Sequence, residues 1–305
     1  MTNPVAFRPV TVALLALGFF VLGAPWSPSV TAQAQSQTIF INLSDADGNP
    51  VTDLRPDEVT VQWDGVNCET LDLELINWPV RVTVFVDNGK GGATSVQHMR
   101  EGLKDFIAAI PDGVEVALLT IAGRPQWVIR HTVDKVELLR GVDLIVPRAS
   151  ASSRFLDALV EEAGRLDDDD ERHYYPVILM LGSDGPEDSS ANERRTEQMM
   201  ERMQENAATV HSYLASNGRQ SLQTQLGIGL GTMTGGQYRP IGASTAFMSL
   251  LPELGEDIAR KHRLVSNQYR VTYAPPDGAS EEPGVSISLT RSGMKMVATM
   301  DGNIQ

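Results

Sequence analysis

Hydrophobic and polar residues alternate with the period of a β-strand in the segment that follows residue 35. The runs 39–43 and 59–63 each place apolar side chains at every second position, and 71–75 repeats the pattern. Asp-Gly pairs at 47–48 and 64–65 predict tight turns between such runs. Residues 35–78 are therefore predicted to form a small antiparallel β unit, which is too short to be a complete sandwich alone.

From residue 81 onward, short apolar runs alternate with amphipathic stretches of helical period. The run 82–86 is apolar and β-branched, as in a strand that is buried on both faces. Strands that alternate with helices predict an α/β fold, in which a doubly wound, mostly parallel sheet is flanked by helices on both faces. Strands are predicted at 82–86, 114–121, 126–131, 177–181, 210–214 and 237–241, and helices at 96–110, 134–144, 156–166, 192–204, 222–233 and 247–258.

The strand pattern returns after His262, at 269–273, 285–289 and 294–300, with no helical stretch between these runs. We expect these late strands to pair with the N-terminal ones, so that both ends of the chain build one small β unit. The predicted organisation is a leader at 1–34, an N-terminal β unit at 35–78, an α/β domain at 79–265 and C-terminal β-strands at 266–305.

The first 34 residues have the pattern of a secretory signal peptide. Arg8 is their only charged residue, and it precedes an apolar run at 10–24 and the small-x-small sequence Ala32-Gln33-Ala34. The alternative is a permanent membrane anchor, but an apolar run of 15 residues is short for a span. We expect cleavage near Ala34, no membrane span in the mature chain, and an exported protein in the periplasm, at the cell surface or secreted.

Charge and cysteine content exclude several classes of site. The net charge of −14 argues against a nucleic-acid surface, because phosphate binding needs clustered Lys and Arg. The single cysteine, Cys68, excludes an intramolecular disulfide and a thiolate metal cluster. The five histidines show no metal-ligand spacing, and the glycines at 227, 229 and 231 do not complete a dinucleotide fingerprint, so we expect them to allow close packing.

Two carboxylates occupy equivalent places in the predicted sheet. Asp87 directly follows the first buried strand, Asp184 follows the second, and Ser153 opens a helix. In open parallel sheets, ligands bind at the carboxyl ends of the strands. These three oxygen-bearing side chains could therefore ligate a hard divalent cation.

Six short strings follow one another along the chain: Asp-Gly-Asn-Pro-Val-Thr-Asp-Leu at 47–54, Val-Phe-Val-Asp at 84–87, Ser-Arg-Phe-Leu-Asp-Ala-Leu at 153–159, Asp-Gly at 184–185, Thr-Gly-Gly at 234–236 and Tyr-Arg-Val-Thr-Tyr-Ala-Pro at 269–275. Their order resembles the von Willebrand factor type A fold, in particular the bacterial exported group called VWFA-related. The resemblance covers nearly the whole mature chain, and it implies that the protein binds protein partners at the edge of the sheet that carries the family's metal motif.

The metal motif of that family is incomplete here. Its first part is Asp-x-Ser-x-Ser, whereas this chain has Asp87-Asn88-Gly89-Lys90-Gly91, so Gly89 and Gly91 replace the usual serines. Asp87, Asp184, and Ser153 in place of a threonine are the ligands that carry over. This degenerate site should bind Mg²⁺ or another divalent cation weakly, and the alternative is that the two carboxylates only accept hydrogen bonds in their turns.

Lys90 lies in the same loop as Asp87. It could turn inward between two flexible glycines and neutralise the carboxylates, or it could point into water.

Taken together, the sequence predicts an exported, non-enzymatic binding module that meets an unknown protein partner at this edge of the sheet, without a cofactor. Two alternatives remain open. One is a hydrolase that uses Asp87 and Asp184 as an acid/base pair. The other is a structural component of the cell envelope.

Overall fold

A computed structural model gives the fold of most of the chain. The predicted signal peptide, 1–34, lies outside the residues that the structure describes, and so does the end of the last predicted strand. The described residues are 36–169, 173–216, 218, 220–276, 278, 280 and 284–299.

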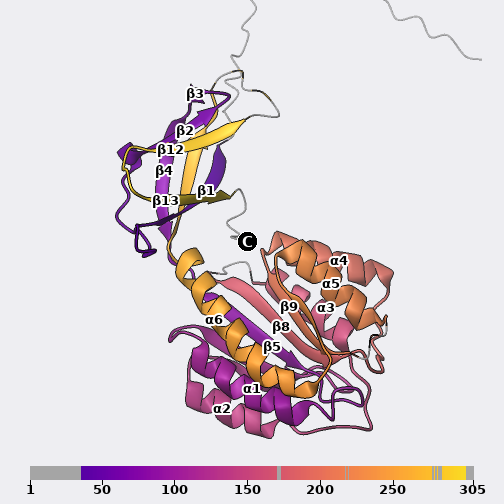
Figure 1. Ribbon diagram of the computed structural model, residues 1–305. Coiled ribbons are helices and arrows are strands. Elements are labelled where there is room, and N and C mark those ends of the chain that lie inside the picture. The colour runs from indigo at the N-terminus through magenta and orange to yellow at the C-terminus, as the bar shows by residue number, and fades with distance from the viewer. Residues whose placement is uncertain are drawn as a thin grey trace, which may run out of the picture. The chain divides into compact units, whose positions relative to one another are not determined.

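A six-stranded sheet lies at the centre of the α/β part of the chain (Figure 1). Its strand order is β10-β9-β8-β5-β6-β7, and all neighbours are parallel except β6 and β7. The prediction of a mostly parallel sheet is thus confirmed. The strands are β5 (Val80–Val86), β6 (Glu115–Thr120), β7 (Gln126–Thr132), β8 (Tyr175–Ser183), β9 (Thr209–Ala215) and β10 (Tyr238–Ile241).

Helices cover both faces of this sheet, as Figure 1 shows, and each face has its own apolar core. Val82 and Val84 of β5 pack into the first core, whereas Phe85 packs into the second. Because alternate side chains of a strand point to opposite faces, a strand covered on both sides must be apolar almost throughout. The first core holds α1 (Val96–Ala109), α2 (Lys135–Leu144) and α6 (Phe247–Val265), and the second holds α3 (Phe155–Asp167), α4 (Glu193–Glu205) and α5 (Leu222–Thr234).

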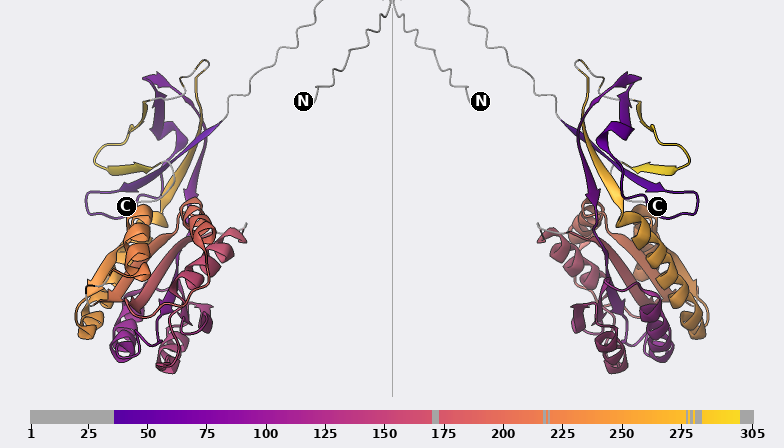
Figure 2. Two further views of the ribbon diagram at one scale, coloured as in Figure 1. Left: turned by 90° about the vertical axis from the view of Figure 1, so that its right-hand side faces the viewer. Right: turned by 90° about the vertical axis from the view of Figure 1, so that its left-hand side faces the viewer.

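The remaining strands form a small antiparallel β unit from both ends of the described chain. β1 pairs with β11 and with β13, and β2 pairs with β12, so indigo N-terminal strands lie beside yellow C-terminal ones (Figure 2). This part of the predicted fold class is also confirmed. The strands are β1 (Gln37–Ser44), β2 (Val59–Trp63), β3 (Val66–Asn67), β4 (Glu69–Ile76), β11 (Gln268–Ala274), β12 (Val285–Leu289) and β13 (Lys295–Thr299), and two short 3₁₀ turns lie at Pro56–Glu58 and Ser244–Ala246.

Glycines set the distance between α1 and α6. A Cβ on Gly102 would lie 2.3 Å from the carbonyl oxygen of Phe247, and one on Gly255 would lie 2.8 Å from the Cβ of Ala109. The two helices can approach this closely only because these positions lack a side chain.

Two of the three glycines at 227, 229 and 231 in α5 also allow close packing. A Cβ on Gly227 would lie 2.9 Å from the Cδ2 of Tyr238, and one on Gly231 would lie 3.3 Å from the Tyr238 nitrogen, so both face the sheet. Gly229 differs, because a Cβ there would meet nothing within 4 Å. The close packing expected at these positions therefore holds for Gly227 and Gly231 and not for Gly229.

These contacts predict opposite effects of the same substitution in two helices. Gly102→Ala should lower the free energy of unfolding by about 1–3 kcal/mol, because the new methyl group overpacks the α1–α6 contact. Gly229→Ala should raise it by about 0.5–1 kcal/mol, since it removes the helix penalty of glycine in open space. Urea unfolding followed by circular dichroism checks both, and a stabilising Gly102→Ala would contradict the packing described.

Candidate functional site at the carboxyl edge of the sheet

The carboxyl ends of the parallel strands meet at one edge of the sheet, and we call the loops that follow them the crest. Register places Val86 of β5 opposite Leu181 of β8, and the Asp87 amide donates to the Leu181 carbonyl at 2.7 Å. Two residues further on, the Ser183 hydroxyl donates to Asp87 Oδ2 at 3.1 Å. The parallel pairing of β5 with β8 thus joins the first and the second acidic turn.

Asp87 is buried at the base of the crest. Its carboxylate is 1% exposed and accepts a second hydrogen bond, from the Gly89 amide to Oδ1 at 2.8 Å. Burial raises the pKa of the Asp87 carboxyl above its ordinary value, and the two hydrogen bonds oppose that shift only in part.

Asp184 occupies the equivalent position after β8, closer to the surface. Its amide donates to the carbonyl of Ala215 at 3.0 Å, and the hydroxyl of Ser216 donates to its Oδ2 at 3.0 Å. The side chain is 9% exposed and lines a cavity. Asp184 is therefore the acidic residue that contributes to the lining of this cavity.

Ser153 joins the crest through its backbone. Its amide donates to the Pro186 carbonyl at 3.1 Å, and its carbonyl accepts from the Asp188 amide at 2.9 Å. The structure thus brings the loops of Asp87, Ser153 and Asp184 together at the crest. The Ser153 hydroxyl is buried and has no hydrogen-bond partner within the described ranges.

A polar cavity of about 230 Å³ opens at the crest between the loops that follow β5, β8, β9 and β10. Two of its hydroxyls, those of Ser95 and Ser244, are hydrogen-bonded to each other at 2.7 Å. Hydroxyls both donate and accept, so this lining can match either kind of polar group on a ligand. The polar residues that line the cavity are Thr94, Ser95, Ser183, Asp184, Ser216 and Ser244.

Sequence reasoning missed most of these hydroxyls. Ser183 directly precedes Asp184 in a Gly-Ser-Asp-Gly string, but no function was predicted for Ser183 from the sequence. Ser216 directly follows β9, so the rule that identified Asp87 and Asp184 would have identified it if the strand had been extended to Ala215. Ser216 could therefore have been predicted from the sequence if the end of this strand had been predicted correctly.

The glycines of the first acidic turn allow close backbone approach. A Cβ on Gly91 would lie 2.2 Å from Ser183 Oγ and 2.8 Å from Gly185 Cα, and one on Gly89 would lie 2.8 Å from the carbonyl oxygen of Ala151. Neither glycine has a positive φ, so conformational freedom is not the reason for glycine at these positions.

This packing bears on the divalent cation that the family resemblance implies. The two hydroxyl ligands of the family motif have no room. A side chain on Gly91 would meet Ser183 and Gly185, and a side chain on Gly89 would meet the carbonyl oxygen of Ala151. Mg²⁺ demands near-octahedral oxygen coordination. The buried Ser153 hydroxyl and the two carboxylates are oxygen donors, but this arrangement does not fit the family's Mg²⁺ site. No group of three or more His, Cys, Asp or Glu suited to a metal ion occurs among the described residues.

The position of Lys90 agrees with the second alternative, in which its side chain points into water. Its side chain is exposed, and its amide donates to the carbonyl of Ala151 at 2.7 Å. The inward turn required positive φ at the flanking glycines, which Gly89 and Gly91 do not have.

Comparisons with known proteins found similarity in structure only. No family model matches the chain, and no curated protein matches it. Similar solved structures include a von Willebrand factor type A protein from Catenulispora acidiphila, with 9% identity and a TM-score of 0.48 over 87% of this chain and 72% of that one. They also include proximal thread matrix protein 1 from the mussel byssus, with 13% identity and a TM-score of 0.48 over 62% of this chain.

This chain spans 50% of the length of the mussel protein. A third similar structure is the conserved hypothetical protein BatB from Bacteroides thetaiotaomicron, with 10% identity and a TM-score of 0.42 over 60% of this chain and 99% of that one. The family that the sequence resembles is thus represented among the similar structures.

The buried carboxyl of Asp87 predicts a specific dependence of stability on pH. Since its pKa is raised in the folded state, the folded protein binds the proton more tightly than the unfolded chain does, and stability falls as the pH rises from the ordinary value of 3.8 through the raised pKa. Asp87→Asn keeps an acceptor for the Gly89 amide and removes the charge, so this loss should be absent. The difference in unfolding free energy between the variant and the wild type should grow in favour of the variant as the pH rises above the ordinary value of 3.8, until the Asp87 carboxyl is ionised in the folded protein as well.

Urea unfolding at several pH values measures this difference. The contributions of the other carboxylates to the pH dependence are the same in both proteins, so they cancel in this difference. A difference that is constant over this range would show that the Asp87 pKa is not raised.

Proposed function

We propose that this chain is an exported, non-enzymatic binding module that holds a protein partner at the crest. The observation that carries the proposal is the open, hydroxyl-lined cavity with Asp184 at its wall. Six polar side chains converge on one recess, from the end of β8 and from the loops after four strands, and an α/β sheet presents a ligand site in this way. The carboxylate of Asp184 favours partner surfaces that present hydrogen-bond donors.

The position of Asp87 does not favour the alternative of an acid/base pair. A general acid or base must come within hydrogen-bond reach of the reacting group. Asp87 is 1% exposed, both of its carboxylate oxygens accept hydrogen bonds from the protein, and it is not part of the cavity lining. We therefore assign Asp87 the role of fixing the first acidic turn against Ser183.

We also propose that the partner is bound without a divalent cation. The support for this is the contact between Gly91 and Gly185, which occupies the place where the family motif needs a hydroxyl ligand. Capture of the partner should then be insensitive to a chelator, because hydrogen bonds from the cavity lining make the contact directly.

Export is the remaining part of the proposal, and it is supported by the sequence of residues 1–34. Among the described residues, no helix has both the length and the apolar character to cross a membrane. We predict that the mature protein, isolated from the producing cells and measured by mass spectrometry, begins near Gln35. A chain that starts at Met1 in the extracellular fraction would rule out cleavage near Ala34.

A steric block of the cavity tests the proposed site. Gly242 lines the cavity, and a Cβ there would meet nothing within 4 Å, so Gly242→Tyr adds a ring at the recess without strain at its attachment point. The matched control is Gly229→Tyr, at a position of α5 with equally open space. In a pull-down from periplasmic and secreted fractions, the Gly242 variant should lose at least about tenfold of the captured partner, and the Gly229 variant should not.

The same experiment is repeated with EDTA and with Mg²⁺. Equal capture in both conditions is the expected result. Capture that survives Gly242→Tyr would contradict the crest as the binding site, and capture lost in EDTA would contradict the metal-free contact.

A further inference from the structure

Helix α2 and the residues that flank it expose a group of apolar side chains. Eleven large apolar side chains are exposed among the residues that the structure describes, and five of them lie between residues 133 and 146. Apolar side chains that are scattered singly over a surface need no explanation, whereas a group on one short segment is typical of an interaction site. The five are Val133, Val136, Leu139, Leu144 and Val146.

The inner face of α2 already packs on the sheet. Leu138 and Val142 are buried in the first core, and a Cβ on Gly141 would lie 2.2 Å from Cγ1 of Ile129 in β7. A helix that buries only one face has polar and charged residues on the other. Since α2 also exposes apolar side chains, its outer face has the composition of a surface that another molecule covers.

The charge of this region differs from that of the whole chain. The segment 126–144, which spans β7 and α2, carries three basic and three acidic side chains and is therefore neutral, within a chain of net charge −14. Two copies of an acidic protein repel each other, and a neutral face is where this repulsion is weakest. The charged residues of the segment are Arg130, Lys135 and Arg140, and Asp134, Glu137 and Asp143.

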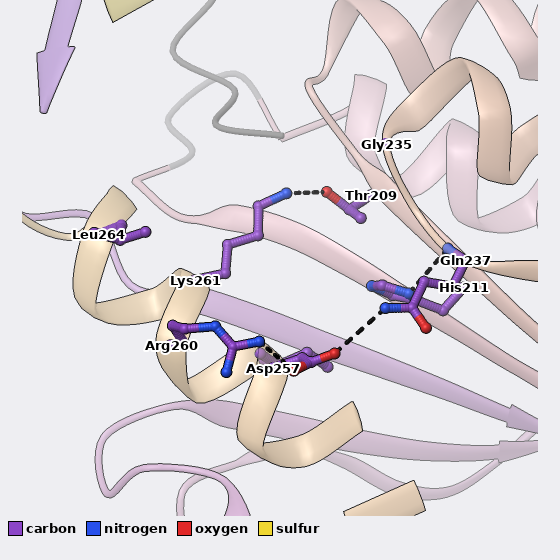
Figure 3. A pocket seen from close by; sticks show the side chains of 9 residues that line it. Thr209, His211, Gly235, Gln237, Asp257, Arg260, Lys261 and Leu264 are labelled. Atoms are coloured by element: carbon purple, nitrogen blue, oxygen red, sulfur yellow. Dashed lines mark hydrogen bonds and ion pairs between the residues drawn. The ribbon is translucent and has the colours of Figure 1, made fainter. Parts of the chain in front are cut away.

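Glu137 and Arg140 are exposed, and neither forms an ion pair within the part of the chain that the structure describes. An acid and a base at the same spacing do pair in α6. There Arg260 forms an ion pair with Asp257, beside the cavity that His211 lines at the start of β9 (Figure 3). Because Glu137 and Arg140 have this spacing without the pair, both charges are available to a second molecule.

These two charges lie in a row that is complementary to itself. Val133 directly precedes the N-cap of α2, and Glu137, Arg140 and Leu144 follow at intervals of four, three and four residues. Residues three and four apart share one face of a helix. When two such rows lie antiparallel across a two-fold axis, Glu137 of each copy faces Arg140 of the other. The same axis sets Val133 opposite Leu144, because both pairs have their midpoint between residues 138 and 139.

We propose that the outer face of α2 binds a second copy of this chain, as an antiparallel helix pair across a two-fold axis. Glu137 and Arg140 form an ion pair on each side of the axis, Leu139 meets its own counterpart near the axis, and Val133 packs against Leu144 at both ends. In a two-fold dimer, one patch of the surface meets itself in this way. One helix face makes a small interface, so the dimer is weak, with a Kd of about 10–100 μM.

Sedimentation velocity of the mature protein at about 5–500 μM measures this association. The weight-average sedimentation coefficient should rise with concentration, from that of a monomer towards that of a dimer. A chain that stays monomeric throughout would overturn the proposal. If that chain floats with phosphatidylglycerol vesicles, or if Leu144→Asp abolishes capture of the partner proposed for the crest, the apolar group serves a lipid surface or that partner instead.

Charge reversals test the pairing itself. Glu137→Arg sets cations opposite each other on both sides of the axis, and Arg140→Glu does the same with carboxylates, so each variant alone should raise the dimer Kd at least about tenfold. An equimolar mixture of the two variants should associate about as tightly as the wild type, because every base of one copy then faces an acid of the other.

The matched control is Glu197→Arg in α4, an exposed position without an ion pair among the described residues. It changes the net charge as much as Glu137→Arg does, and the dimer Kd should stay unchanged. Recovery in the mixture cannot come from a loss of folding, since both of its chains carry a substitution. A Kd that the reversals leave unchanged, or that mixing does not restore, would contradict the α2 interface.

Discussion

The parallel pairing of β5 with β8 is the constraint on which the candidate site depends. It fixes Val86 opposite Leu181, and Asp87 and Ser183 then meet within hydrogen-bond distance as the chain leaves the sheet. Burial of both strands on both faces makes this register hard to change, since a slip of one residue would exchange the side chains of the two cores. The geometry of the crest is therefore a consequence of core packing, because the strands that carry its loops are fixed by the two cores.

The glycines of the first acidic turn add a second constraint, at the crest itself. They allow Gly91 to lie against Gly185, so the turn after β5 and the turn after β8 pack backbone against backbone. A family motif with serines at these positions needs the same space for side chains. At Gly91, the loss of a hydroxyl ligand thus accompanies the close contact of the two turns, and what remains accessible is a hydroxyl-lined recess beside Asp184.

Much of this could be predicted from the sequence, for identifiable reasons. The apolar, β-branched run at 82–86 and the apolar run at 177–181 indicated buried parallel strands, and the side chains that follow such strands must lie at one edge, which placed Asp87 and Asp184 correctly. The reason for Gly89 and Gly91 could not be predicted, because close approach depends on which residues face them across the crest. A cavity that is lined by His211 could not be predicted either, because it forms only where α6 lies beside the start of β9.

The proposal of a metal-free crest depends on the backbone contact that closes its turns. Isothermal titration of the mature protein with Mn²⁺ and Mg²⁺, with Asp87→Asn in parallel, tests it most directly. We expect no saturable heat in the submillimolar range for either protein. Submillimolar binding to the wild type that is lost in Asp87→Asn would contradict it, because the first acidic turn would then be a metal ligand.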